Sequence, residues 1–248
     1  MRARSAGAIV PAMTNDLPAR IATLDWPGVA AGLDARGCAT TGRLLTPDEC
    51  AALSSSYDGE TGFRTRITMA RHGFGQGEYQ YFAYPLPAAV AALRTGLYAP
   101  LASVANGWAG ALGQPGYPTD HAAYLRVCHE AGQARPTPLL LRYGTGDYNC
   151  LHQDLYGALH FPLQVAILLS EPGADFTGGA FVLTEQRPRM QSRVEVVALR
   201  QGEAVVFAVN QRPVQGTRGM YRVTMRHGVS RLLSGRRHTL GIIFHDAK

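Results

Sequence analysis

The sequence predicts an α+β fold in which a β-sandwich or barrel carries a helical layer on its outside. Two observations predict it. The pattern is mainly helical from residue 21 to about residue 132, and short apolar runs between turn residues follow from residue 136 to residue 248. Strands at this spacing are typical of a sandwich or barrel. At 248 residues the chain suits one such domain, which we expect over 21–248.

The expected helices are marked by capping signals and by apolar spacing. In TPDECAAL, Thr46 suits an N-cap, Pro47 the first helical position, and Glu49 completes a capping box. The stretch 85–112 has apolar residues at three- and four-residue spacing, and TDHAAYLRVCHEAG predicts a further helix with Thr119 or Asp120 as its cap. These helices form the expected layer over about 21–132.

The expected strands lie in the second half of the chain, as the core of the domain over about 136–248. They are 138–144, 163–170, 178–185, 194–199, 204–209 and 238–244. Residues 1–20 lack periodicity and hold two prolines, so a flexible tail is expected there.

Composition restricts the class of protein. Hydrophobic residues make up 46% and charged residues 17%, as in ordinary globular proteins. The apolar run near the N-terminus is too short and broken for a signal peptide, and no later stretch suits a bilayer span, so no membrane partner is expected. The four cysteines show no CxxC pairing, which favours a reducing, cytoplasmic setting. The oligomeric state stays open.

The positive charge is concentrated in one segment. The whole chain carries 24 − 18 = +6, whereas Arg187–Arg237 holds eleven arginines against two glutamates, or 11 − 2 = +9. The rest of the chain is therefore at −3. GC-rich coding explains arginine in place of lysine, but it does not explain why acids avoid this segment. A basic face that meets phosphates and an ordinary solvated surface are both open.

One stretch, LRYGTGDYNCLHQDLYG, places a histidine and an aspartate two positions apart after a glycine-rich turn. If this is a strand, His152 and Asp154 share a face and project into one space. That is a metal-binding geometry that lacks a third ligand. Spacing alone leaves four candidates for that ligand: His160, His227, His238 and His245.

The sequence around one of these histidines carries a family resemblance. RHGVSRLLSGRRHTLGIIF holds His227, then Arg237 ten positions later, then Thr239 and an apolar strand. Together with LHQD, it resembles the HxD…H…R-x-S/T pattern of the Fe(II)- and 2-oxoglutarate-dependent oxygenases, over roughly residues 136–246. The resemblance implies a double-stranded β-helix, a jelly-roll-like barrel.

The resemblance also implies a ligand set. Two imidazoles and one carboxylate suit non-haem Fe(II), with 2-oxoglutarate and O2 filling the open positions. A zinc site could use the same three ligands, but it offers no role for the arginine. The implied metal ligands are His152, Asp154 and His227, and the implied contacts to 2-oxoglutarate are Arg237, Thr239 and Tyr143.

Within that superfamily the chain is most similar to a bacterial group near the AlkB-type DNA-repair oxygenases. The likeness runs from about Gly37 to the C-terminus and includes FRTRITMARHGFGQGEYQYFAYPLP and EQRPRMQSR. Two positions depart from AlkB. Leu141 stands where AlkB has an asparagine that contacts the cosubstrate, and Tyr156 replaces an acid that helps to read the damaged base. These departures leave open whether the chain demethylates damaged bases with the same residues as AlkB.

The candidate substrate-binding residues lie in two stretches. The first combines aromatic residues with arginines, and the second is short and rich in arginine. In FRTRITMARHGFGQGEYQYF such a mixture suits a stacked base and its phosphates, although a hairpin with half its aromatics in the core gives the same pattern. GFGQGEY is expected to be a lid or turn. RPRMQSR suits a solvated loop or a phosphate contact. The candidates are Arg64, Arg71, Tyr79, Tyr81, Arg187 and Arg189.

The sequence therefore predicts an Fe(II)- and 2-oxoglutarate-dependent dioxygenase that acts on nucleic acid in DNA damage response or repair. Single-stranded or distorted DNA is the expected partner, because an enclosed iron reaches a base only outside the stack. One alternative is an oxygenase that hydroxylates a protein side chain or a small molecule. Another is a nucleic-acid-binding protein with a vestigial iron site.

Overall fold

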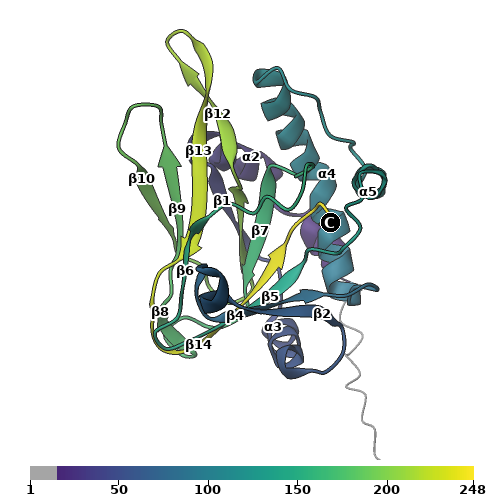
Figure 1. Cartoon of the computed structure of the whole chain (residues 1–248), viewed down its shortest axis with the longest axis vertical. Helices are drawn as coiled ribbons and strands as arrows, with labels where there is room; N and C mark the ends of the chain where they lie inside the picture. The colour runs from purple at the N-terminus through teal and green to yellow at the C-terminus, as the bar shows by residue number, and fades with distance from the viewer. Residues whose placement is uncertain (1–15) are drawn as a thin grey trace, which may run out of the picture.

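The structure, a computed structural model, describes residues 16–248 as two facing β-sheets with helices on one side (Figure 1). Neighbouring strands within each sheet pair antiparallel. Figure 1 places the two sheets side by side, with the long helix α4 (Ala88–Ala111) beyond the larger of them. The predicted sandwich-like β core with an outer helical layer is confirmed.

The larger sheet has eight strands, in the order β1-β11-β7-β14-β5-β4-β2, with β8 paired to β14. Its strands are β1 (Cys38–Arg43), β2 (Phe63–Thr68), β4 (Glu78–Phe82), β5 (Leu139–Gly144), β7 (Leu163–Leu168), β8 (Phe176–Gly178), β11 (Glu203–Ala208) and β14 (Leu232–Ile242). Strands distant in sequence, such as β1 and β11, lie next to each other in this sheet.

The smaller sheet has six strands, in the order β10-β9-β13-β6-β3, with β12 paired to β13. Its strands are β3 (Gly75–Gln76), β6 (Tyr148–His152), β9 (Phe181–Gln186), β10 (Arg193–Val197), β12 (Gln211–Gly216) and β13 (Gly219–Val229). The hairpin β12–β13 extends beyond the rest of the sheet at the top of Figure 1.

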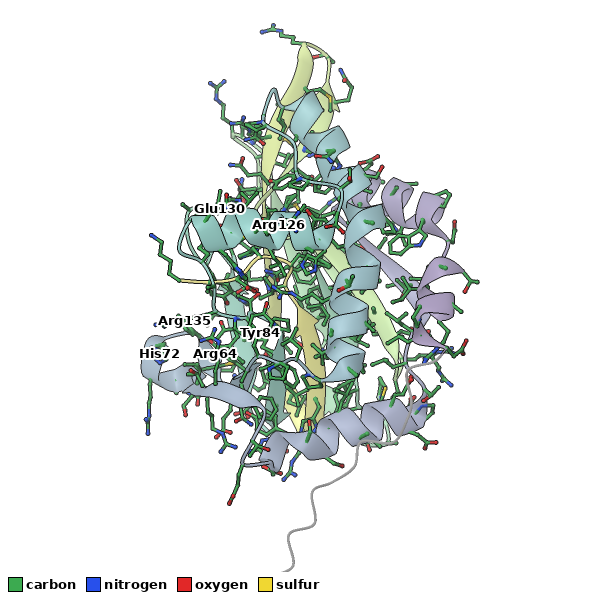
Figure 2. All side chains as sticks on the ribbon, turned by 90° about the vertical axis from the view of Figure 1, so that its right-hand side faces the viewer. Arg64, His72, Tyr84, Arg126, Glu130 and Arg135 are labelled. Carbon is green, nitrogen blue, oxygen red and sulfur yellow. The ribbon has the colours of Figure 1, made fainter. Side chains whose placement is uncertain are left out.

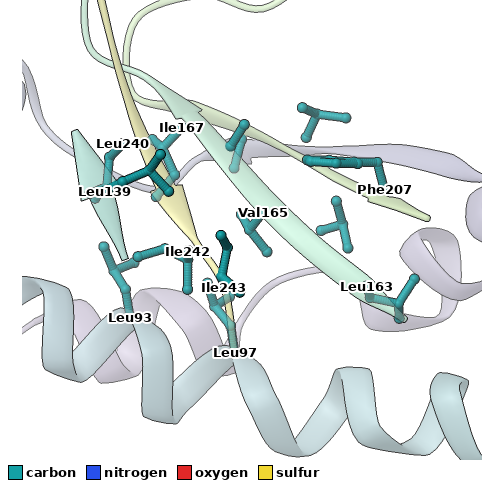
Figure 3. Packing of buried hydrophobic residues seen from close by; sticks show 14 of the residues in the cluster. Leu93, Leu97, Leu139, Leu163, Val165, Ile167, Phe207, Leu240, Ile242 and Ile243 are labelled. Carbon is teal, nitrogen blue, oxygen red and sulfur yellow. The ribbon is translucent and has the colours of Figure 1, made fainter. Parts of the chain in front are cut away.

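The helices cover the outer face of the larger sheet. Besides α4 they are α1 (Leu17–Ala22), α2 (Trp26–Arg36), α3 (Pro47–Ser55) and α5 (His121–Glu130), with two 3-10 turns, η1 (Ser56–Asp58) and η2 (Met69–His72). Figure 2, in which Arg126 and Glu130 mark α5, shows this helix crossing α4. Figure 3 shows Leu93 and Leu97 of α4 packed beside Ile242 and Ile243.

The predicted helix starts are confirmed by their capping contacts. At α3, the Glu49 amide donates to Thr46 Oγ1 at 3.2 Å and the Thr46 amide donates to Glu49 Oε2 at 2.8 Å, which is the predicted capping box. At α5, Asp120 is the cap and accepts from the Ala123 amide at 2.8 Å. Local signals were sufficient here because each cap joins residues three apart.

The alternation of side chains along β14 separates the core from the space between the sheets. Leu240 and Ile242 are buried in the hydrophobic core on the side of α4. Arg237, Thr239 and Gly241 alternate with them and line a cavity between the two sheets. The polar residues of the last strand therefore face inward, toward the smaller sheet.

Two predicted boundaries differ from the structure. The segment 21–132 is not only helical, since it contributes β1, β2 and β4 to the larger sheet and β3 to the smaller one. Residues 1–15 of the predicted flexible tail, 1–20, lie outside the described residues. The rest of that segment is not a tail, because Leu17 begins helix α1 and is fully buried in the core. An amphipathic helix of six residues is too short to show periodicity in the sequence.

Helix α4 is the one helix of residues 16–248 that is long and apolar enough to cross a membrane by length and composition. In the fold it packs against α1 and the larger sheet, and its buried residues include Val90, Leu97 and Leu101. This packing is that of a core helix.

Candidate active site

The two strands that carry the predicted histidines are neighbours in the smaller sheet. His227 of β13 is the cross-strand partner of His152, the last residue of β6. Their imidazole centroids lie 4.2 Å apart. Asp154 follows two residues after the end of β6, where the chain leaves the strand. The three side chains are thereby brought to one place from two segments about 75 residues apart in sequence.

The three side chains converge on one point. Asp154 Oδ1 lies 3.4 Å from His152 Nε2, and Asp154 Oδ2 lies 3.4 Å from His227 Nε2. One ligand atom from each residue falls within 4.8 Å of the other two. His152 Nδ1 donates to the Cys150 carbonyl at 2.8 Å, which turns Nε2 toward the carboxylate. Two nitrogens and one carboxylate oxygen on one face suit non-haem Fe(II) with open positions.

Electrostatics hold the carboxylate in the form that binds a metal. Burial alone would raise the pKa of Asp154, but hydrogen bonds from His152 and His227 outweigh it and hold the pKa well below its usual range. Burial lowers the pKa of His227, which favours the neutral imidazole that ligates metals. A tyrosine hydroxyl, Tyr156 Oη, donates to Asp154 Oδ1 at 2.6 Å and fixes the orientation of the carboxylate.

The other candidate histidines lie elsewhere. His245 is fully buried near the C-terminus, where its Nδ1 accepts from the Phe161 amide at 3.2 Å. His238 packs against Tyr57, with ring centroids 5.9 Å apart. His160 lines a separate cavity next to α4. Only His227 shares the metal-sized cluster with the HxD pair in the part of the chain described.

A cavity of about 180 Å³ lies between the sheets and joins the triad to Arg237, Thr239 and Tyr143. Arg237 is only 2% exposed, and its guanidinium has no carboxylate partner among residues 16–248. Its Nη1 donates to Thr239 Oγ1 at 2.6 Å, while its Nε and the Tyr143 hydroxyl have no hydrogen-bond partner within the described part of the chain. Burial lowers the pKa of Arg237 to about 10.

Unpaired polar groups of this kind are costly unless a ligand completes them. A buried cation without a partner is strongly unfavourable, and buried donors normally find acceptors. Arg237, Thr239 and Tyr143 therefore form a donor set for a carboxylate, and this set opens into the same cavity as the triad. The residues present fit both Fe(II) and 2-oxoglutarate.

The sequence did not single out Gln164, which the structure places in the cavity wall on β7. Its side chain is buried and its Nε2 has no hydrogen-bond partner from Asp16 onward. The available signal was a single polar residue inside the apolar run LQVAILLS. Leu141 also lines the cavity, where its apolar side chain supplies no donor.

The candidate substrate residues of the first stretch split between cavity and core. The hairpin β2–β4 forms, and Tyr79 lines the cavity. Tyr81 is buried beneath Arg64, whose guanidinium lies 4.4 Å above the ring. Tyr81 is therefore not placed to stack a base, since both core packing and Arg64 cover its ring. Arg71 is exposed on η2.

The candidates of the second stretch lie at the turn between β9 and β10. Arg189 is exposed, but Arg187 Nε pairs with Glu185 Oε1 at 2.9 Å. Arg193 and the buried Arg212 pair with the same glutamate. Glu185 lies two residues before the basic segment, so it was not counted in the local charge. Part of that charge is thus neutralised within the smaller sheet.

Comparison with known proteins gives the family and the fold. A family model, Oxygenase-NA, described as "Oxygenase, catalysing oxidative methylation of damaged DNA", matches residues 77–247. Uncharacterized proteins from two strains of Mycobacterium tuberculosis are each 48% identical over 167 residues, which is 67% of this chain and 72% of theirs.

Several solved structures share the fold at low sequence identity. A prolyl hydroxylase of Trichoplax adhaerens, solved with a hypoxia-inducible-factor peptide, is 15% identical with a TM-score of 0.55 and covers 93% of each chain. A 2OG-Fe(II) oxygenase of Burkholderia pseudomallei is 14% identical with a TM-score of 0.52, over 88% of this chain and 89% of that one. A Pseudomonas putida prolyl-4-hydroxylase is 14% identical with a TM-score of 0.51, over 90% and 100%. The predicted double-stranded β-helix is thereby confirmed.

Proposed function

Since the chain belongs to the Oxygenase-NA family, we propose that it is an Fe(II)- and 2-oxoglutarate-dependent oxygenase that acts on damaged nucleic acid. The observation that carries the proposal is that two donor sets open into one cavity. The His152, Asp154 and His227 cluster presents ligand atoms that suit a metal, and the buried Arg237 presents a cation that suits a carboxylate.

The residues of the chain have distinct tasks in this reaction. His152, Asp154 and His227 hold Fe(II), and Arg237 with Thr239 and Tyr143 binds the far carboxylate of 2-oxoglutarate. When bound, Fe(II) supplies the redox chemistry that couples oxidation of 2-oxoglutarate by O2, to succinate and carbon dioxide, to insertion of one oxygen atom into a substrate C–H bond. The apolar wall of Phe181 and Phe207 excludes water from this chemistry.

The substrate assignment follows the description of the family and the shape of the site. The triad lies inside a cavity, so a base reaches it only when it has left the stack. We therefore assign single-stranded or distorted DNA as the partner in a damage-repair setting. Tyr79, at the cavity wall, contacts the base. The four cysteines, all free, suit a reducing cytoplasm.

The test is succinate formation from 2-oxoglutarate by the Fe(II)-loaded protein, with and without single-stranded DNA that carries alkylated bases. Succinate that rises with this DNA, together with loss of the alkyl group by mass spectrometry, supports the proposal. Succinate that is unaffected by DNA favours an oxygenase of a protein side chain or small molecule. DNA binding without any metal-dependent succinate indicates a vestigial iron site. The control is His227→Ala, which removes one ligand and abolishes turnover.

A further inference from the structure

Arginines from three segments, Arg64, Arg71 and Arg135, have no acidic partner among residues 16–248. Arg64 of β2 donates its Nε to the Pro136 carbonyl at 2.9 Å, which places it beside the exposed Arg135. Burial is the main cause that lowers the pKa of Arg64, and the positive charge of Arg135 lowers it further. Figure 2 shows Arg64, Arg135 and His72 in the same region of one face.

Arg64 is linked to the triad through two aromatic rings. Its guanidinium lies over the Tyr81 ring, and Tyr81 meets Tyr156 edge to face with centroids 6.1 Å apart. Tyr156 in turn donates to Asp154 at 2.6 Å. The cationic group is therefore held near the cavity by contacts that continue to the metal ligands.

A second link runs through the turn η2 and the strand β3. Arg71 and His72 are exposed on η2, and the His72 ring stacks on Phe74 at 5.3 Å. Phe74 lines the cavity although it is 46% exposed, so it stands at the cavity rim. The Phe74 carbonyl accepts from the Cys150 amide at 2.9 Å, which ties this segment to the strand that carries His152.

The charges of this region are free, whereas three arginines of the arginine-rich segment, Arg187, Arg193 and Arg212, share Glu185 as their partner. Among residues 16–248, no ion pair includes Arg64, Arg71 or Arg135. Free cations beside an exposed aromatic ring suit a chain that carries both phosphates and planar bases.

We propose that Arg64, Arg71 and Arg135, with Phe74 at the rim, form the surface that binds the backbone of single-stranded DNA while one base enters the cavity. This inference rests on the proposed function, and it names the part of the surface that the substrate contacts. It places the polymer on the β2–β4 hairpin, on η2 and on the residues before β5. The surface of β9, β10, β12 and β13, which holds most of the Arg187–Arg237 charge, lies outside it.

The test compares two double variants that change the net charge equally. Arg71→Glu with Arg135→Glu alters two exposed side chains of the proposed surface. Arg218→Glu with Arg222→Glu alters two exposed residues of the β12–β13 hairpin. Arg218 is nine positions from His227, or roughly 30 Å along an extended chain. Neither pair touches the triad or Arg237.

Binding of a fluorescently labelled oligothymidylate is measured by anisotropy at several salt concentrations. The Arg71/Arg135 variant is expected to bind at least roughly 10-fold more weakly at low salt. The slope of the logarithm of its binding constant against the logarithm of salt concentration should fall in magnitude by about 1.4, or about 0.7 for each lost phosphate contact. The Arg218/Arg222 variant is expected to bind as the wild type does. Arg64→Gln provides a second measurement and is expected to lower the slope by about 0.7.

Each other outcome overturns a defined part of the account. If the wild type binds the oligonucleotide but the two double variants weaken binding equally, the surface is wrong while the proposed function stands. If the wild type binds no oligonucleotide at low salt, the nucleic-acid function itself fails. Tighter binding of an oligouridylate of equal length overturns DNA as the polymer.

Discussion

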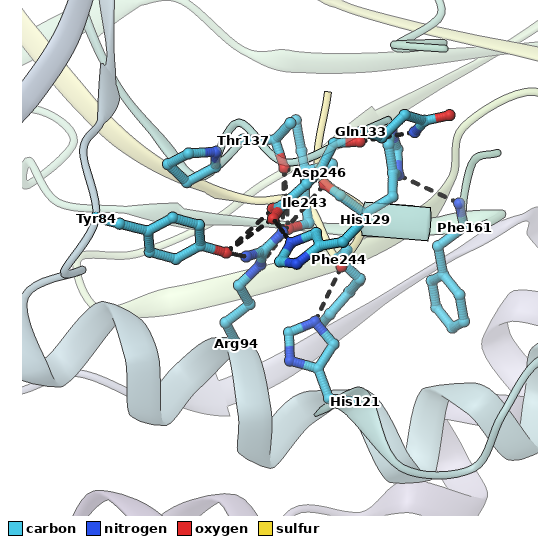
Figure 4. Close-up of polar contacts among 12 residues, drawn as sticks. Tyr84, Arg94, His121, His129, Gln133, Thr137, Phe161, Ile243, Phe244 and Asp246 are labelled. Atoms are coloured by element: carbon cyan, nitrogen blue, oxygen red, sulfur yellow. Dashed lines mark hydrogen bonds and ion pairs between the residues drawn. The ribbon is translucent and has the colours of Figure 1, made fainter. Parts of the chain in front are cut away.

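Arg94 and Arg237 are both buried, with exposed fractions of 1% and 2%, but only one of them is completed by the protein. Arg94 extends from α4 to Asp246, with its Nη2 2.8 Å from Oδ1, and it also donates to the carbonyls of Ile243 at 2.8 Å and His245 at 3.0 Å (Figure 4). Within the residues that the structure describes, Arg237 donates only to Thr239.

The difference separates a structural arginine from a ligand-binding one. Figure 4 shows Arg94 and Tyr84 directed at Asp246, together with His129 of α5. This cluster fastens the end of the chain to α4 and α5. A third buried arginine, Arg212, has Glu185 as its partner. Burial alone therefore does not identify a binding arginine. The identifying feature is a buried cation whose missing partner faces a cavity.

The largest expected effect concerns stability. Arg94→Met leaves Asp246 buried without its main partner, and the loss of one member of such a pair costs about 3–5 kcal/mol. Arg237→Met removes a charge that has no carboxylate partner. The free energy of unfolding of the metal-free protein should therefore change by less than about 1 kcal/mol. Urea unfolding of both variants measures the free energies. Equal losses in the two would remove the distinction between the two arginines.

The next effect is on cosubstrate binding. Arg237→Met is expected to weaken binding of 2-oxoglutarate to the Mn(II)-loaded protein on the order of 100-fold or more, because the far carboxylate loses its buried cation. Arg236→Met is the matched control, since Arg236 is exposed on the opposite face of β14. Calorimetric titration measures both. Loss of 2-oxoglutarate binding in the Arg236 variant, with retention in the Arg237 variant, would show that Arg236 and not Arg237 faces the cavity.

A smaller effect is expected where a tyrosine holds the metal-binding carboxylate. Tyr156→Phe removes the 2.6 Å hydrogen bond to Asp154, and loss of such an outer partner typically weakens metal binding about 10- to 100-fold. Tyr98→Phe is the control, because its hydroxyl donates to the Pro118 carbonyl instead. Metal affinity is measured by competition with a coloured chelator. An unchanged affinity would mean that Tyr156 only fills space.

The smallest effect is a pH dependence of the Asp246 cluster. Burial opposes ionisation of Asp246, but Arg94 and the hydrogen bonds from His129 and Tyr84 lower its pKa below the ordinary value. A lowered folded-state pKa gives stability that is present above the unfolded pKa of about 3.9 and is lost as pH falls through the folded value. Asp246→Asn should therefore lower the free energy of unfolding near neutral pH, where the wild-type carboxyl is charged.

The same variant gives the check on the sign. The difference in unfolding free energy between wild type and Asp246→Asn should shrink as the pH is lowered below about 4, because the carboxyl is protonated first in the unfolded chain and in the folded protein only at lower pH. A difference that grows on acidification would show that the carboxyl is not stabilised in its charged form.

Local signals in the sequence were enough for some parts of the fold and the site. The capping box at Thr46 and the strands around Leu163 and Val205 depend on neighbours in sequence, and both were predicted. The HxD pair was visible for the same reason. The choice of His227 needed the family resemblance, because spacing alone left four histidines open. The cross-strand pairing of His227 with His152 is the physical cause of that choice.

Other parts depend on contacts that span the chain. The pairing of β1 with β11 joins Cys38 to Phe207, and no local pattern shows it. Glu185 neutralises arginines that include Arg212, 27 residues away, so a charge count over one segment overestimated the free charge. The salt bridge from Arg94 to Asp246 spans 152 residues. Such long-range contacts are formed by the fold, and the sequence contains no periodic signal for them.

The central claim is that Arg237 is left unpaired in order to bind the far carboxylate of 2-oxoglutarate beside the metal. The most direct measurement is calorimetric titration of the Mn(II)-loaded protein with 2-oxoglutarate and with pyruvate, which shares the keto-acid end but lacks the far carboxylate. We expect 2-oxoglutarate to bind on the order of 100-fold more tightly in the wild type, and this preference to disappear in Arg237→Met. Equal affinity of the two acids for the wild-type protein would contradict the claim.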